Sequence, residues 1–173
     1  MDDAAIRADI TARTDAYFSR TKAVVTRFGD KRVTYAVFLR RPMLCAPRVM
    51  LEWLTRAAAA CGETFDVVVP HAEGTLVAAN VPLLTITGSM AALSEMETIF
   101  LQKIGAACVA AHNAWQMCLA LPNAAFLAME ARHCAGADMQ DLMAYAASVG
   151  SAAAKRAGAK GFIGNAKIGR AHV

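Results

Sequence analysis

The feature that most constrains the fold is a strand–helix–strand pattern over residues 123–166. Two short apolar runs, at residues 124–129 and 161–166, flank a segment in which apolar residues recur at helical spacing. That segment, 138–156, begins with an acid, ends with two cations and has Gly158 beyond its end, which is the order of charge and capping typical of a helix. The pattern predicts two parallel strands with a helix across one face.

Ligands of α/β folds bind beyond the carboxyl ends of parallel strands. The loop after the first predicted strand, residues 130–137, is therefore the first place to look for a binding site. The second strand is rich in glycine, which lets the backbone approach a ligand closely. Its candidate contacts are Phe162, Gly164 and Asn165.

The first half of the chain predicts a mixture of helices and strands. A helix is expected over residues 4–27, although Thr14 and Asp15 could start a second one, and another helix is expected over 47–60. The apolar stripe of the first segment is predicted to face the core. It consists of Ile6, Ile10, Tyr17, Val24 and Phe28. Strands are expected at residues 31–40, 64–69, 75–79 and 83–87, and their short connections predict one mostly antiparallel sheet.

Residues 89–121 form the longest apolar segment, with Ser89 as its expected N-cap. From residue 104 to residue 121 there is no formally charged side chain, so a membrane span has to be considered. Polar side chains, including His112 and Gln116, interrupt the middle of the run. We therefore favour a buried central helix.

Composition limits the possible functions. With 57% hydrophobic residues in 173, the chain can bury a core. Its net charge of +4 is scattered, which does not favour nucleic-acid binding. Five cysteines without a CxxC pair, and an acidic N-terminus where a signal peptide is basic, predict reduced thiols in the cytoplasm. The adjacent pair His133 and Cys134 does not have the spacing of metal ligands, so no metal site is expected.

Six pieces of sequence resemble, in this order, the N-terminal half of the nicotinate phosphoribosyltransferase family. The similarity covers residues 14–166. The pieces are TDAYF at 14–18, FLRR at 38–41, PHAEG at 70–74, VPLLTITG at 81–88, EMET at 95–98 and ARHCAG at 131–136.

The resemblance implies an α+β N-terminal sandwich domain followed by the first βαβ unit of a truncated α/β barrel, as in type II phosphoribosyltransferases. We place the sandwich domain with its long helix at residues 1–121 and the start of the barrel at 122–166. The implied reaction joins nicotinate to phosphoribosyl pyrophosphate, giving nicotinate mononucleotide in NAD salvage. The resemblance also implies ATP and Mg²⁺ as cofactors and a homodimer as the full-length assembly.

Two residues match substrate-binding positions of the family. Tyr17 matches the tyrosine of a TDxY motif, which lies against the nicotinate ring, usually from the neighbouring subunit. Arg132 matches an arginine in the loop after the first barrel strand. An aromatic face and a guanidinium suit a flat ring that carries a carboxylate. Tyr17 could instead be a core residue, and Arg132 could pair with Glu130 or Asp138.

The catalytic residue is expected outside this chain, because the family's phosphorylated histidine lies on a later strand, and His133 is the less favoured choice. Residues 168–173 can be encoded by ATCGGAAGAGCACACGTC, a widely used sequencing adapter, so 167–173 is predicted to be a non-native tail. The chain alone is expected to be inactive. Two alternatives stay open: a non-catalytic binding or regulatory module, and a related phosphoribosyltransferase that uses nicotinamide or quinolinate.

Overall fold

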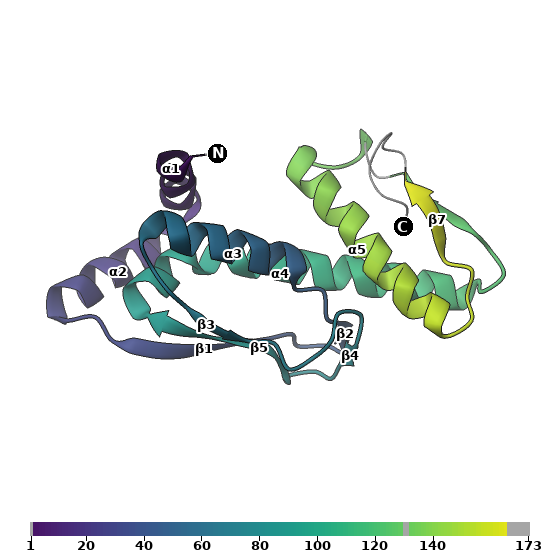
Figure 1. The fold of residues 1–173 in the computed structure, drawn as a ribbon, viewed down its shortest axis with the longest axis horizontal. Coiled ribbons are helices and arrows are strands. Elements are labelled where there is room, and N and C mark those ends of the chain that lie inside the picture. Colours follow the sequence, from purple (N-terminus) through teal and green to yellow (C-terminus); the bar gives the residue numbers. More distant parts are fainter. Residues whose placement is uncertain (1, 130–131, 166–173) are drawn as a thin grey trace.

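One long helix, α4 (Met90–Ala120), runs through the computed structural model, which describes residues 2–129 and 132–165 (Figure 1). The Ser89 hydroxyl accepts a hydrogen bond from the Ala92 backbone N–H at 3.1 Å, which confirms the predicted N-cap. Core side chains along its whole length, from Leu93 to Cys118, are buried. None of the helices in the described residues is both long and apolar enough to cross a membrane. The central-helix prediction is therefore confirmed.

Two helices precede the first strand. α1 (Asp3–Arg13) ends at Thr14, whose ψ of 130° is extended, and α2 (Ala16–Phe28) begins after Asp15. The prediction of one helix over 4–27 is therefore wrong, and the alternative start at Thr14 and Asp15 is confirmed. An extended residue between two helices changes the direction of the chain, so α2 runs at a new angle.

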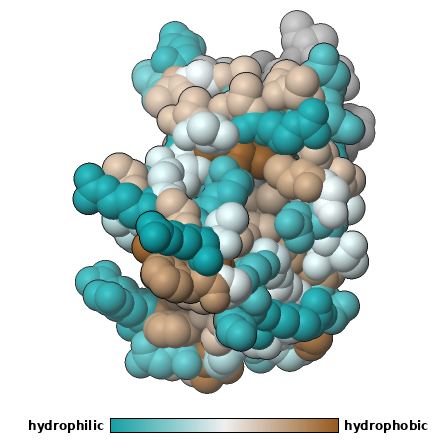
Figure 2. All heavy atoms as spheres, turned by 90° about the vertical axis from the view of Figure 1, so that its left-hand side faces the viewer, coloured by the Kyte–Doolittle hydropathy of each residue, from teal (hydrophilic) through white to brown (hydrophobic). Residues whose placement is uncertain are grey.

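This change of direction also alters which face of α2 is covered. Ile10 of α1 is buried, as predicted, but Tyr17, Val24 and Phe28 are 59%, 56% and 76% exposed. The core alternative for Tyr17 is therefore wrong, and the stripe through Val24 and Phe28 does not face the core, because the helical period restarts after the break at Thr14 and Asp15. Figure 2 shows this end of the molecule, where apolar side chains lie between hydrophilic ones. The half-buried face of α2 includes Phe18 and Lys22 instead.

Two small antiparallel sheets replace the single predicted sheet. β5 lies between β1 and β3, and β2 pairs with β4. The prediction that the strand at 75–79 joins the main sheet is wrong. Cys45 N–H donates to the Thr75 carbonyl at 2.8 Å and Gly74 N–H donates to the Cys45 carbonyl at 2.8 Å, which holds this segment beside β2. The strands are β1 (Arg32–Phe38), β2 (Met43–Leu44), β3 (Asp66–Val68), β4 (Leu76–Val77) and β5 (Pro82–Ser89).

The main sheet has one covered face. Side chains of β1 alternate along the strand, and Val37 is buried while Arg32 and Thr34 are exposed. Helices α3 (Arg48–Cys61) and α4 lie on one side of the sheet (Figure 1). The first half is thus a layer of helices on a sheet whose other face is open.

The last third of the chain forms the predicted strand–helix–strand unit. β6 (Phe126–Ala128) and β7 (Phe162–Asn165) pair in parallel, and α5 (Ala137–Arg156) connects them. The parallel pairing is confirmed. Ala166, which was predicted to end the second strand, and the predicted tail at 167–173 lie outside the described residues.

The closest approach of two helices is the contact of α5 with α4. A Cβ added to Gly150 of α5 would lie 2.3 Å from the Ala111 carbonyl oxygen and 2.9 Å from the Ala114 methyl group of α4. Both distances are shorter than van der Waals contact, and one of the two groups belongs to the helix backbone. Only a residue without a side chain therefore fits at position 150.

Replacement of Gly150 by alanine should force the two helices apart. We expect a loss of unfolding free energy of about 1–3 kcal/mol, as for other overpacked cores, measured by urea denaturation. The matched control is Gly105→Ala in α4, where no atom lies within 4 Å of an added Cβ. That control should be neutral or stabilising by about 0.5–1 kcal/mol, because alanine favours a helix over glycine. Equal effects of the two substitutions would contradict the close contact.

Candidate functional site

Tyr17 stands beside the corner between α1 and α2, which is tied to the first turns of α4. The Thr14 hydroxyl lies 2.7 Å from both the Ile10 and the Glu95 carbonyl oxygens. Since a hydroxyl has one hydrogen, the two acceptors share it. The backbone N–H of Asp15 donates to the Thr98 hydroxyl at 3.2 Å. The sequence pieces TDAYF and EMET are thus in direct contact, through residues 81 and 83 positions apart.

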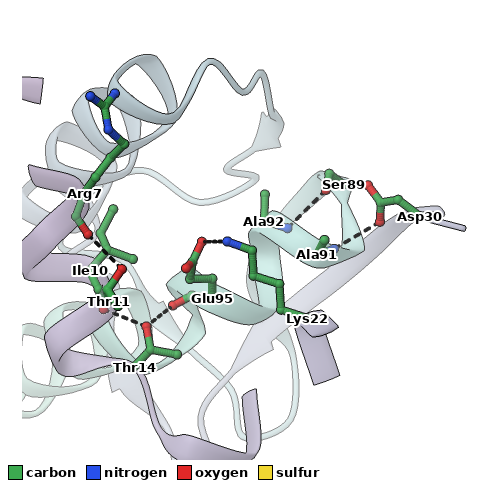
Figure 3. Close-up of polar contacts among 10 residues, drawn as sticks. All are labelled: Arg7, Ile10, Thr11, Thr14, Lys22, Asp30, Ser89, Ala91, Ala92 and Glu95. Carbon is green, nitrogen blue, oxygen red and sulfur yellow. Dashed lines mark hydrogen bonds and ion pairs between the residues drawn. The ribbon is translucent and has the colours of Figure 1, made fainter. Parts of the chain in front are cut away.

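A charged contact holds the middle of α2. The Lys22 ammonium donates to the Glu95 carboxylate at 2.5 Å, and Figure 3 shows the two side chains meeting between α2 and α4. The same view shows Thr14 reaching the Glu95 carbonyl. Because α2 contains no buried residue, these polar contacts carry much of its attachment to α4.

The Tyr17 side chain remains accessible from solvent. Its ring packs on Phe18 with the centroids 4.1 Å apart. Partial desolvation and the carboxylates of Asp15 and Glu97 raise the pKa of the Tyr17 phenol, and a phenol is neutral at physiological pH even at its ordinary pKa. The site at this end of the molecule is therefore an exposed, uncharged aromatic ring on a fixed corner.

Glu97 is a second half-buried acid of the EMET piece, beside Glu95. Burial raises the pKa of its carboxyl group, and a hydrogen bond with Tyr35 offsets part of that rise. The Tyr35 hydroxyl also lies 3.4 Å from the Ser94 hydroxyl. Sequence reasoning did not single out this carboxyl group with a raised pKa beside the exposed Tyr17 ring, although it lies within the EMET piece.

The loop that contains Arg132 follows β6. Arg132 and His133 are exposed, and no ion pair joins Arg132 to Asp138 in the part of the chain that the structure describes. Glu130, the other suggested partner of Arg132, lies outside the described residues. The Arg132 guanidinium is thus placed where a ligand beyond the carboxyl end of β6 can reach it.

The three candidates on β7 lie in different surroundings. Phe162 is 5% exposed and packs against the Phe126 ring, with the centroids 5.5 Å apart, so it is a core residue of this unit. Gly164 has space for a side chain, since an added Cβ would meet only Leu127 at 3.5 Å. Asn165 ends the strand. Gly164 is therefore not required for close packing in the way that Gly161 is.

Gly161 packs closely against α5. Its φ is +67°, and an added Cβ would lie 2.6 Å from the Ser151 hydroxyl. That hydroxyl accepts a hydrogen bond from the Phe162 N–H at 2.9 Å, and the Lys155 ammonium donates to the Phe162 carbonyl at 2.9 Å. The glycine therefore serves the packing of β7 on α5.

A polar contact that the sequence did not indicate joins the PHAEG piece to α5. The buried Tyr145 hydroxyl donates to the Glu73 carboxylate and accepts a hydrogen bond from the Arg48 N–H at 3.1 Å. The Arg48 guanidinium lies over the Tyr145 ring at 4.4 Å. Burial and the hydrogen bond to Glu73 raise the pKa of Tyr145, so it acts as a neutral donor. The contact ties the loop at 70–74 to the last third of the chain.

The structure does not bring Tyr17 and Arg132 together in one chain. α2, which carries Tyr17, lies at the left end of Figure 1, whereas α5, which begins shortly after Arg132, lies in the right-hand half. Within the described ranges, no three His, Cys, Asp or Glu side chains are grouped so that they could hold a metal ion. The two halves of the candidate site are thus separate surfaces.

Solved structures of phosphoribosyltransferases share this fold. NadC from Streptococcus pyogenes matches with a TM-score of 0.62 and 18% identity over 96% of this chain and 54% of that one. Nicotinate-nucleotide pyrophosphorylase from Pyrococcus furiosus matches with a TM-score of 0.61 and 22% sequence identity. The match covers 91% of this chain and 39% of that one. Human nicotinic acid phosphoribosyltransferase matches with a TM-score of 0.61 and 21% sequence identity. The match covers 79% of this chain and 34% of that one.

This likeness establishes a mixed α/β fold that resembles those of type II phosphoribosyltransferases. The chain spans about half or less of the length of these proteins. No family model matches the sequence, and no curated protein matches it in sequence. The comparisons therefore bear on the fold, while the reaction and the substrate are matters of proposal.

The raised pKa of Glu97 predicts a pH dependence of stability. The folded state binds the proton of the Glu97 carboxyl group more tightly than the unfolded state does. The protonated group therefore stabilises the fold below the ordinary carboxyl pKa of 4.5, and this stabilisation is lost as the pH rises through the raised pKa of the folded state. Glu97→Gln should therefore raise the melting temperature at neutral pH more than at about pH 4.5. The control Glu52→Gln, at an exposed carboxylate, should show no such difference. A larger gain for Glu97→Gln in acid would contradict the prediction.

Proposed function

We propose that this chain is the N-terminal part of a nicotinate phosphoribosyltransferase acting in the cytoplasm. The reaction would join nicotinate to phosphoribosyl pyrophosphate and give nicotinate mononucleotide and pyrophosphate. The proposal covers an α+β sandwich domain at residues 1–121 and the first βαβ unit of an α/β barrel at 122–166. It also covers a homodimer of the full-length protein.

One combination of observations supports the proposal. Six sequence pieces occur in the order of that family, and the chain adopts a fold shared with human nicotinic acid phosphoribosyltransferase. The contacts between the pieces add support, because TDAYF touches EMET and the His71 ring of PHAEG lies 3.1 Å from the Pro82 carbonyl of VPLLTITG. Pieces that are scattered in sequence meet in space, as the parts of one functional unit must.

The chemistry suits the two candidate residues. In the reaction the pyridine nitrogen forms a bond to the ribose C1, the bond from C1 to the pyrophosphate oxygen breaks, and pyrophosphate leaves with the electron pair. Tyr17 offers a neutral ring on which the pyridine can stack. Arg132 offers a guanidinium for the nicotinate carboxylate. Neither residue supplies or removes a proton, so their role is to bind and orient the base.

A second chain would complete the site. Tyr17 and Arg132 lie on separate surfaces of one chain, so a shared ligand requires Tyr17 from one subunit and Arg132 from its partner. The exposed apolar side chains around Tyr17, including Val24 and Phe28, suit a surface that becomes buried on association. The proposed homodimer rests on this complementarity and on the family resemblance.

ATP and Mg²⁺ belong to the proposal as cofactors. The described residues contain no cluster of acids or histidines that would fit a metal ion. We therefore assign no residue of this chain to Mg²⁺, and we derive no step through it.

A related reaction is the second candidate. NadC and nicotinate-nucleotide pyrophosphorylase share the fold with TM-scores of 0.62 and 0.61, against 0.61 for the human enzyme, which favours quinolinate as an alternative base. Quinolinate carries a second carboxylate beside the ring nitrogen, and nicotinate mononucleotide can form from it only with loss of CO₂. Release of CO₂ therefore distinguishes the two substrates.

The proposal predicts the effect of removing each binding group in the complete gene product. Tyr17→Ala should weaken use of the pyridine substrate by about 1–3 kcal/mol, because a stacked ring is lost, and Tyr17→Phe should retain it. Arg132→Ala should act on the same step, whereas Arg56→Ala, an exposed cation on α3, should not. The measurement is KM and kcat with nicotinate, nicotinamide and quinolinate in parallel. Unchanged kinetics in Tyr17→Ala and Arg132→Ala would contradict the site, and no turnover by the wild type would favour a non-catalytic module.

The 173-residue chain alone should not turn over substrate. Residues 2–129 and 132–165 contain one parallel pair of strands, with Leu127, Met129 and Ile163 exposed at 59%, 52% and 59%, and such a surface favours association. We expect no nicotinate mononucleotide from phosphoribosyl pyrophosphate, ATP and Mg²⁺, and an oligomeric elution profile in size-exclusion chromatography. An active, monodisperse monomer would show that the barrel interpretation is wrong.

A further inference from the structure

α2 differs from the other helices of the fold in how it is held. α1, α3, α4 and α5 each bury at least one side chain, whereas α2 buries none. Three of its apolar side chains, Tyr17, Val24 and Phe28, are exposed to solvent. The hydrogen bonds and the ion pair to α4 therefore have more influence on the position of α2 than similar contacts have on a helix with a buried face.

We infer that Thr14, Thr98 and the pair of Lys22 and Glu95 are positioning residues for Tyr17. The inference rests on the proposed function in one respect, that the Tyr17 ring contacts the pyridine substrate. These residues do not touch the substrate themselves. They fix the corner and the helix from which the ring projects.

The geometry places an anchor on each side of Tyr17. Before it, the Asp15 N–H is held by the Thr98 hydroxyl at 3.2 Å, and the Thr14 hydroxyl joins the end of α1 to the Glu95 carbonyl at 2.7 Å. After it, Lys22 is bound to the Glu95 carboxylate at 2.5 Å. Glu95 thus receives contacts from both sides of the ring, through its carbonyl and through its side chain (Figure 3).

The chain supplies matched controls for a test. Thr98→Val and Thr14→Val remove hydroxyls that bridge different elements, with little change in volume. Thr11→Val and Thr21→Val remove hydroxyls that bond only within their own helices, to the Arg7 carbonyl at 3.1 Å and to the Tyr17 carbonyl at 3.0 Å. Any general effect of replacing threonine by valine in a helix appears in both pairs.

The first measurement is hydrogen–deuterium exchange of the 173-residue chain. Loss of one anchoring hydrogen bond should increase exchange of the amides in residues 16–22 by about 2- to 10-fold in Thr98→Val and Thr14→Val. Amides of α4 and α5 should exchange as in the wild type, and the two controls should leave α2 unchanged. Exchange of α2 at the wild-type rate in Thr98→Val and Thr14→Val overturns the inference, whatever the kinetics show.

The second measurement uses the complete gene product. Thr98→Val should raise KM for the pyridine substrate by about 2- to 10-fold with little change in kcat or in KM for phosphoribosyl pyrophosphate, and Thr98→Ser should behave as the wild type. Faster amide exchange of α2 in Thr98→Val, together with an unchanged KM in Tyr17→Ala, would support the role of these residues in holding α2 and would contradict the proposed role of Tyr17. If Tyr17→Ala raises KM and Thr98→Val does not, the positioning role is overturned.

Discussion

The close contact between α4 and α5 is the interaction on which the arrangement of the two halves of the chain depends. Gly150 lets the two helix backbones approach, and Ala111 and Ala114 on α4 have side chains small enough to allow it. Short side chains bring more backbone and methyl atoms into contact, so dispersion and burial act over the whole crossing. The packing accounts for the absence of charge at the buried positions of this segment, such as Ala111 and Ala114, because a charged side chain there would be buried without a partner.

Polar contacts then set the positions of the elements that this packing does not reach. The phenol of Tyr145 ties the loop at 70–74 to α5, and Thr14 and Lys22 tie α1 and α2 to α4. Several of these contacts involve the same sequence pieces that carry the family resemblance. Such pieces therefore have a structural role beside any role in binding, and a motif match alone does not tell which residue of the motif meets a ligand.

Local patterns in the sequence predicted the elements, while contacts between distant segments decided their arrangement. The parallel pair of β6 and β7, the cap at Ser89 and the helix over 137–156 all follow from signals within a few residues. The pairing of β2 with β4 does not, because two-residue strands have no periodicity to read. The exposure of Tyr17 depended on which of the two predicted helix starts applied, since the extended residues Thr14 and Asp15 turned the apolar stripe away from the core.

The separation of Tyr17 from Arg132 has a symmetric solution. In a symmetric interface the α2 surface of one chain meets the loop after β6 of its partner. A two-fold axis repeats the contact, so that the α2 surface of the partner meets the loop after β6 of the first chain. Both copies of the site are then complete, and the apolar side chains beside Tyr17 are covered. A helix held by polar anchors suits this arrangement, because the interface itself supplies the apolar burial that α2 lacks within its own chain. On this proposal the site and the dimer would form in the same step.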